Sequence, residues 1–149
     1  AATVATTTST LPPVHVPPGR CLTGADVAAW PLSAQIGHVV MIGVPIAEAA
    51  RARALAQRFT LGGVLVRGTP TSASGPAIKA IRDARPGLPT IIAVDEEGGR
   101  VQHLRTAIGI FPSARRQAEL TPAELRTRAA AYGRSMRALG FAGATVIPQ

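Results

Sequence analysis

The sequence is short of cysteine, lysine, aromatic residues and long apolar runs. Its single cysteine, Cys21, excludes an internal disulfide bond and a cysteine-based metal cluster. Its three histidines are scattered, so they do not indicate a metal site either. No apolar run reaches the roughly 18 residues that a membrane-spanning helix needs. We therefore expect no metal, no cofactor and no membrane span.

The charge of the chain is strongly unbalanced. The formal net charge is +8, and Lys79 is the only basic residue that is not arginine. Such a charge is compatible with an anionic partner. However, the arginines are spread along helical segments and aromatic residues make up only 3% of the chain, so stacking partners for bases are scarce. We therefore expect no nucleic-acid partner, and a solvated basic surface instead.

The chain divides by composition into a tail and a globular part. Residues 1–24 consist mostly of Ala, Thr, Ser and Pro with almost no charge, which predicts a disordered tail or linker. Such tails often join an export signal or an anchor to an extracytoplasmic domain, so a cell-envelope or secreted location is weakly favoured. A disordered end without that role is the equal alternative. Residues 25–149 are long enough for one domain with a real core.

The globular part alternates between expected helices and strands. The first expected elements are a short helix capped by Asp26 and running towards Ile36, a strand over 39–44, and a helix over 46–59 with Ala50, Ala54, Leu55 and Phe59 on one face. A strand over 61–66, a helix over 77–84 that presents Ile78 and Ile81, and a strand over 90–94 follow. The last expected segments are an irregular stretch over 105–120, a helix from Thr121 to Gly140 and a strand over 143–147. Alternation of this kind predicts a parallel sheet with right-handed crossovers. Four such units form half of a (β/α)₈ barrel, which typically needs about 250 residues.

One stretch combines a buried strand with a cluster of acids. Residues 90–94 are apolar or β-branched, and Asp95, Glu96 and Glu97 follow directly, before Gly98 and Gly99. Ligands of parallel α/β proteins bind at this end of the strands. Glu96 and Glu97 are adjacent on extended backbone, so they point to opposite sides, and we expect one to be buried against an arginine.

The segment from Ile91 to Gln102 resembles glycoside hydrolase family 3, most closely its bacterial β-N-acetylhexosaminidases. Three further segments carry the same resemblance, namely 62–64 (Gly-Gly-Val), 111–113 (Phe-Pro-Ser) and 134–140. The resemblance covers residues 33–142 and implies an α/β fold, the amino-terminal half of a (β/α)₈ TIM-type barrel. It implies a retaining glycosidase, which uses a carboxylate nucleophile and an acid/base.

The resemblance also implies roles for single residues. Asp95 matches an aspartate that holds sugar hydroxyls and is not the nucleophile, while Arg100 and His103 are the other substrate-binding candidates. The alternatives are that Asp95 caps the following turn, that Arg100 pairs with a neighbouring acid and that His103 is a loop residue. The family often has an arginine where this chain has His103. Its Lys-His motif, its His-containing acid/base loop and its nucleophilic aspartate have no counterpart here, so we expect no catalytic residue in this sequence.

We thus expect a part of a glycosidase acting on terminal β-linked N-acetylglucosamine, for example in peptidoglycan turnover, that is inactive alone. The expected partner is a carbohydrate. The alternative is a non-catalytic binding or interaction module, whose exposed half-barrel edges favour self-association.

Overall fold

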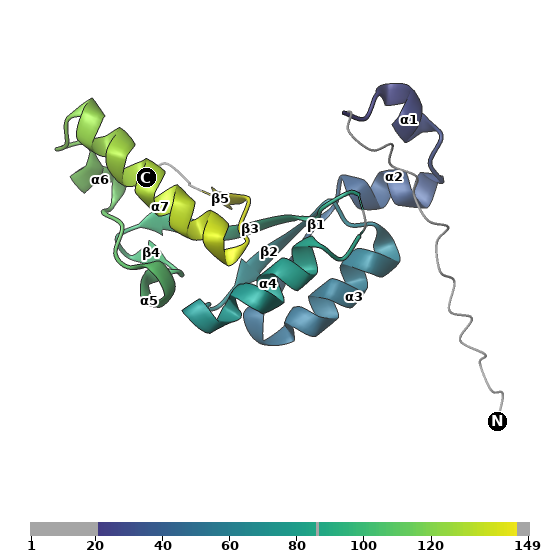
Figure 1. The fold of residues 1–149 in the computed structure, drawn as a ribbon, viewed down its shortest axis with the longest axis horizontal. Coiled ribbons are helices and arrows are strands. Elements are labelled where there is room, and N and C mark those ends of the chain that lie inside the picture. The colour runs from purple at the N-terminus through teal and green to yellow at the C-terminus, as the bar shows by residue number, and fades with distance from the viewer. Residues whose placement is uncertain (1–20, 86, 146–149) are drawn as a thin grey trace.

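The computed structural model describes residues 21–85 and 87–145, so most of the expected tail and the last residues of the expected final strand lie outside it. Its helices are α1 (Gly24–Ala28), α2 (Leu32–His38), α3 (Ala49–Phe59), α4 (Gly75–Arg82), α5 (Arg105–Ile108), α6 (Ala114–Gln117) and α7 (Pro122–Leu139), with 3-10 turns η1 (Ile46–Glu48) and η2 (Ser72–Ser74). Its strands are β1 (Met41–Pro45), β2 (Gly63–Arg67), β3 (Ile91–Gly98), β4 (Val101–Gln102) and β5 (Gly143–Thr145). Figure 1 shows the sheet between α1 and α2 at one end and α6 at the other.

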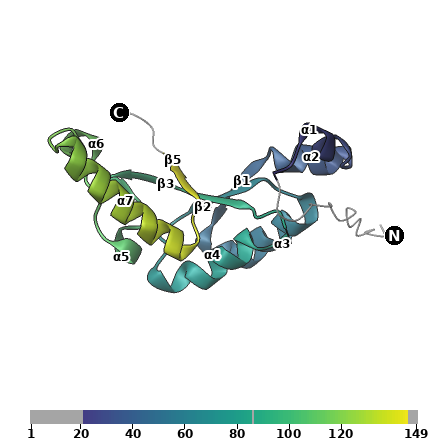
Figure 2. The same ribbon diagram turned by 45° about the horizontal axis from the view of Figure 1, so that its top comes forward.

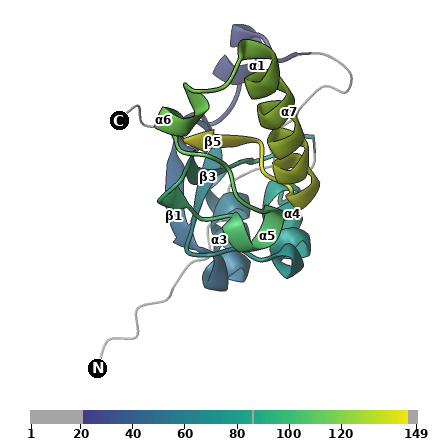
Figure 3. The same ribbon diagram turned by 90° about the vertical axis from the view of Figure 1, so that its left-hand side faces the viewer.

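Four of the strands form a parallel arc in the order β1-β2-β3-β5. Each new strand joins the same edge, so right-handed crossovers carry the helices to one side of the sheet. Figure 2 shows α3, α4 and α7 on that side, and Figure 3 shows them lined up along the outside of the strands. A doubly wound sheet would reverse its strand order and cover both faces. The predicted α/β fold is confirmed, and the strand order is compatible with a partial (β/α)₈ barrel, which stays a prediction.

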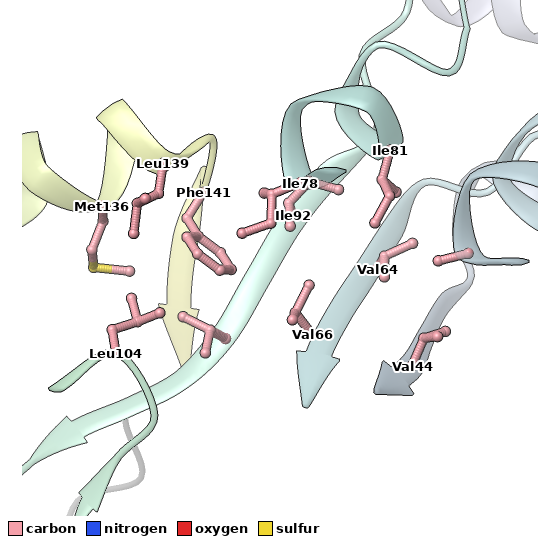
Figure 4. Close-up of a cluster of buried hydrophobic side chains, with 12 residues drawn as sticks. Val44, Val64, Val66, Ile78, Ile81, Ile92, Leu104, Met136, Leu139 and Phe141 are labelled. Atoms are coloured by element: carbon pink, nitrogen blue, oxygen red, sulfur yellow. The ribbon is translucent and has the colours of Figure 1, made fainter. Parts of the chain in front are cut away.

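The main core lies between the sheet and these helices. It is formed by alternate strand residues packed against α4, the end of α7 and the β3–β4 segment, as Figure 4 shows: Val44, Val64, Val66, Ile78, Ile81, Ile92, Val94, Leu104, Met136, Leu139 and Phe141. Because successive strand residues point to opposite faces, the other set faces away from the helices. That second set includes Gly43, Arg67 and Asp95, and we call its side of the sheet the open face.

The amino-terminal helix prediction is wrong in two respects. The segment forms two helices, and the cap of α1 is Thr23, whose side chain accepts from Asp26 N–H while the Asp26 carboxylate accepts from Thr23 N–H. Pro31 separates α1 from α2 because the residue before a proline avoids helical backbone. Asp26 therefore occupies the third helical position of a capping box instead of the cap.

Two further expectations need correction. Helix α3 buries Ala52 and Ala56, whereas the expected face with Ala50, Ala54 and Phe59 is largely exposed. Alanine occurs on several sides of this helix, so hydrophobic periodicity alone does not choose the buried side. The stretch 105–120 is less irregular than expected, because it contains the short helices α5 and α6.

The predicted features of α4 and α7 are confirmed. Ile78 and Ile81 are buried on α4, and Thr121 forms a capping box with Glu124 at the start of α7. Within the described part of the chain, no helix combines the length and apolar character needed to cross a membrane.

Candidate functional site

The candidate site lies where β3 leaves the parallel sheet. The first part of β3 pairs with β2 and β5, and its last residues pair with the antiparallel strand β4. Asp95 occupies the last parallel position, in register with Thr145 of β5, and is partly exposed. Its neighbours Val94 and Glu96 are buried on the helix side, so Asp95 lies on the open face.

Glu96 is the buried acid of the cluster, with 4% of its surface exposed. Its Oε1 accepts a hydrogen bond of 2.8 Å from the Tyr132 hydroxyl, and its Oε2 accepts one of 2.9 Å from Leu104 N–H. The expectation that the buried acid lies against an arginine is therefore wrong, because a hydroxyl and a backbone amide hold it. Bonds of this kind offset the cost of burying a carboxylate.

Two glycines bend the chain directly after the acids. Gly98 and Gly99 have φ angles of +85° and +64°, a backbone conformation that residues with a side chain rarely adopt. A Cβ on Gly98 would overlap the Pro112 carbonyl, and one on Gly99 would lie 2.7 Å from Ser113 Cβ. Gly99 N–H donates to the Phe111 carbonyl at 2.9 Å. The Phe-Pro-Ser segment thus packs on the glycine turn.

The far side of the turn is tied to α7. The Gln102 side chain donates through Nε2 to the Tyr132 hydroxyl at 2.8 Å and to the Gly109 carbonyl at 2.9 Å. The Tyr132 ring stacks on Phe111 with a centroid distance of 4.6 Å. Burial, above all, and the hydrogen bond to Glu96 raise the pKa of Tyr132 well above its usual range. The hydroxyl therefore stays protonated as a donor to Glu96.

The other two predicted binding residues flank β4. Arg100 is exposed between Gly99 and the start of β4, and His103 is partly buried just after its end. The register pairs Glu96 with Gln102, and His103 is the next residue, in the turn that follows β4. His103 thus follows the strand that pairs with the end of β3, whereas Arg100 lies in the turn between β3 and β4.

The sequence interpretation did not single out Arg67, which lies on the same face as Asp95. It ends β2, and its Nε lies 3.5 Å from the point where a Cβ of Gly43 would stand, so its side chain crosses β1 over that glycine. The β2–β3 register ends at Val66 and Val94, so the backbone of Arg67 lies at the same end of the sheet as Asp95, while its side chain is directed over β1. The sequence feature that could have identified it is an arginine at the end of an apolar strand, directly before a loop.

The described residues contain no group of three histidine, cysteine, aspartate or glutamate side chains placed to hold a metal ion. The polar side chains at the open face include the carboxylates of Asp95 and Glu97, which alternate with the buried Glu96 along β3, and the guanidinium of Arg67, while His103 follows the end of β4. Such groups donate to and accept from hydroxyl and amide groups.

No protein-family model matches the chain. Beta-hexosaminidase LpqI of Mycobacterium tuberculosis is 37% identical over 135 residues, which cover 87% of this chain and 34% of that protein. Among solved structures, a family 3 glycosyl hydrolase from Mycobacterium smegmatis superposes with a TM-score of 0.70 and 32% identity, covering 81% of this chain and 37% of that one. The M. tuberculosis LpqI structure superposes with a TM-score of 0.68 and 34% identity, covering 80% of this chain and 35% of that one.

Sequence and fold thus show the same similarity, to a part of α/β glycoside hydrolases. The chain is similar to a part of family 3 glycoside hydrolases, and the relative that it matches in sequence is named a beta-hexosaminidase. It spans about a third of the length of the curated relatives that it matches.

Proposed function

We propose that this chain forms the sugar-holding part of a retaining glycosidase that removes terminal β-linked N-acetylglucosamine. The observation that carries the proposal is the position of Asp95, at the carboxyl end of a central parallel strand and on the open face. A carboxylate there accepts charge-assisted hydrogen bonds from two neighbouring sugar hydroxyls at once. The similarity to beta-hexosaminidase LpqI supports an amino sugar as the substrate class.

His103 and Arg67 complete the proposed binding edge. His103 follows β4, which pairs with the end of β3, and Arg67 ends β2, the strand next to β3, with its side chain directed over β1. Both side chains donate hydrogen bonds, which suits the ring hydroxyls and the acetamido carbonyl of N-acetylglucosamine. Arg100 is proposed as a further contact at the outer end of the turn, where it is exposed. A cell-wall polymer with terminal amino sugars is the natural source of such a substrate.

We further propose that residues 1–149 alone bind the sugar without cleaving it. Retention of configuration requires two carboxyl groups about 5–5.5 Å apart, on either side of the glycosidic bond. Glu96 is buried and held by two hydrogen bonds on the helix side, so it is not available at the face where Asp95 lies. The family's nucleophile and acid/base segments match nothing in this sequence.

Calorimetric titration of the 149-residue chain with N-acetylglucosamine tests the proposal. We expect saturable binding with a dissociation constant of ~1–10 mM, equivalent to a few kcal/mol. Asp95→Asn is expected to weaken binding at least tenfold, while Asp83→Asn, which changes an exposed acid paired with Arg82 at the end of α4, leaves it unchanged. Equal binding by both variants would overturn the role of Asp95. Hydrolysis of a chromogenic N-acetylglucosaminide by this chain would overturn the non-cleaving proposal.

A second candidate is a non-catalytic interaction module, and exposed apolar residues favour it. Leu32 and Ile36 lie one turn apart on α2 and Val39 follows its end, and all three are exposed, as are Met41 and Ile91 at the starts of β1 and β3. Exposed apolar surface of this extent is typical of association sites. Sedimentation equilibrium separates the candidates, because self-association that Val39→Ser abolishes supports the module and a monomer argues against it.

A further inference from the structure

The hydroxyl of Tyr132 sits at the junction of two strands and a helix. It donates to Glu96 Oε1 at 2.8 Å and accepts from Gln102 Nε2 at 2.8 Å. Glu96 and Gln102 are direct partners across the antiparallel β3–β4 pair. Tyr132 comes from α7, which follows them in the chain by about thirty residues. One hydroxyl therefore clamps both sides of the turn to the long helix.

The hydrogen bonds that hold Glu96 also affect the orientation of residues on the open face. Its carboxylate is fixed on the helix side by Tyr132 and by Leu104 N–H, on opposite oxygens. Because adjacent strand residues point to opposite sides, a fixed Glu96 sets the direction in which Asp95 projects. Gln102, directly before His103, is itself held by its hydrogen bonds to Tyr132 and the Gly109 carbonyl. The orientation of both open-face residues thus depends on a group that touches neither.

We propose that Tyr132 is a positioning residue that orients Asp95 and His103 through Glu96 and Gln102. This inference rests on the proposed function, in which Asp95 and His103 are the sugar contacts. The clamp itself is built from three hydrogen bonds and the stacking of Tyr132 on Phe111. The stacking on Phe111 already restricts the tyrosine ring, so the hydrogen bond to Glu96 costs little additional side-chain entropy.

Tyr132→Phe is the test variant, because it keeps the ring and its stacking on Phe111 but removes the hydroxyl. Ser135→Ala is the matched control, since it removes a hydroxyl from the same helix that bonds only to the Ala131 carbonyl of α7. We expect Tyr132→Phe to speed hydrogen exchange of the Leu104 and Gly99 amides at least tenfold. The amides of β2 should keep their protection, which separates a local release of the turn from global destabilisation.

The second measurement is sugar affinity. Tyr132→Phe is expected to weaken N-acetylglucosamine binding about fivefold or more, and Ser135→Ala to leave it unchanged. If the parent chain does not bind the sugar, the proposed function fails, and hydrogen exchange of the turn still decides whether Tyr132 positions it. Unchanged exchange at Leu104 and Gly99 in folded Tyr132→Phe would overturn the inference, as would unchanged affinity in a parent that binds.

Glu96→Gln keeps the test decisive if Tyr132→Phe fails to fold. The amide offers one acceptor oxygen where the carboxylate offers two, so it satisfies only one of the two donors, Tyr132 and Leu104. We expect the same local rise in exchange and the same loss of affinity. Protection and affinity equal to those of the parent would overturn the inference.

Discussion

Leu104 N–H donates a hydrogen bond of 2.9 Å to Oε2 of Glu96, eight residues earlier in the chain. This bond closes the β3–β4 turn from the helix side, while Gly98 and Gly99 form its bend. The Leu104 side chain is fully buried in the main core beneath the same turn. The turn that follows Asp95 is therefore held to the core by Leu104, so substitutions in the core are expected to change the geometry of the turn.

Leu104→Ala should destabilise the chain strongly. The side chain has no exposed surface, so its truncation leaves a cavity and is expected to lower the free energy of unfolding by about 2–5 kcal/mol. Leu32→Ala is the control, because Leu32 is 70% exposed and its loss should change stability by less than about 0.5 kcal/mol. Chemical denaturation followed by circular dichroism measures both. Equal effects of the two substitutions would contradict the burial of Leu104.

Gly98→Ala should also destabilise the chain, for a backbone reason. Alanine at a φ of +85° costs about 1–2 kcal/mol, and the overlap of its Cβ with the Pro112 carbonyl adds to that. We expect a loss of at least about 2 kcal/mol in denaturant unfolding. Gly133→Ala is the opposite case, because nothing lies near its Cβ on α7 and a helix interior gains about 0.5–1 kcal/mol from the change. A tolerated Gly98→Ala would refute the described turn.

Tyr132 should resist ionisation until the fold is lost. Burial first of all, with the hydrogen bond to Glu96, raises its pKa in the folded chain above the value of about 10 in the unfolded chain. A raised folded pKa gives stability that is complete below about pH 10 and is lost as the pH rises through the folded pKa. Tyr132 is the only tyrosine, so tyrosinate absorbance reports this group alone. Absorbance that rises near pH 10 while circular dichroism shows an intact fold would contradict the clamp.

His38 should make stability depend on pH in the mildly acidic range. Burial, and then the nearby Arg85 charge, lower the pKa of His38 in the folded chain. Its contribution is therefore complete above the unfolded value of about 6.5 and is lost as the pH falls through that value towards the lowered folded pKa. Unfolding free energies at about pH 7 and about pH 5, for the parent and His38→Gln, isolate this term. An equal pH dependence in both chains would show that His38 does not carry it.

The order of helices and strands could be predicted because local signals were strong. Thr121 and Glu124 form the expected capping box, and Ile78 and Ile81 form the expected buried stripe of α4. The buried side of α3 could not be predicted, because alanines such as Ala52 and Ala54 differ too little in hydrophobicity to choose a face. The prediction missed the break at Pro31, where the residue before a proline avoids helical backbone.

Some features of the candidate site could also be predicted from the sequence, and others could not. The position of the acid cluster after a buried strand could be predicted from the sequence pattern, and the family resemblance singled out Asp95, which lies at the end of the parallel part of β3. The clamp around Glu96 could not be predicted, since Tyr132 lies 36 residues further along and its helix position was equally suited to packing. Whether Asp95, Arg100 and His103 contact a sugar stays a prediction. Contacts between segments far apart in the chain depend on the packed fold, which local patterns do not encode.

The central claim is that the open face around Asp95 holds an amino sugar, and mapping amide chemical shifts during titration with N-acetylglucosamine tests it most directly. The account predicts saturable shifts at Asp95, His103 and Arg67, with the amides of α2 and the outer side of α3 unmoved. It also predicts that Asp95→Asn abolishes these shifts and that Asp83→Asn preserves them. Shifts confined to other parts of the chain, or none from a folded chain at tens of millimolar sugar, about ten times the expected dissociation constant, would contradict it.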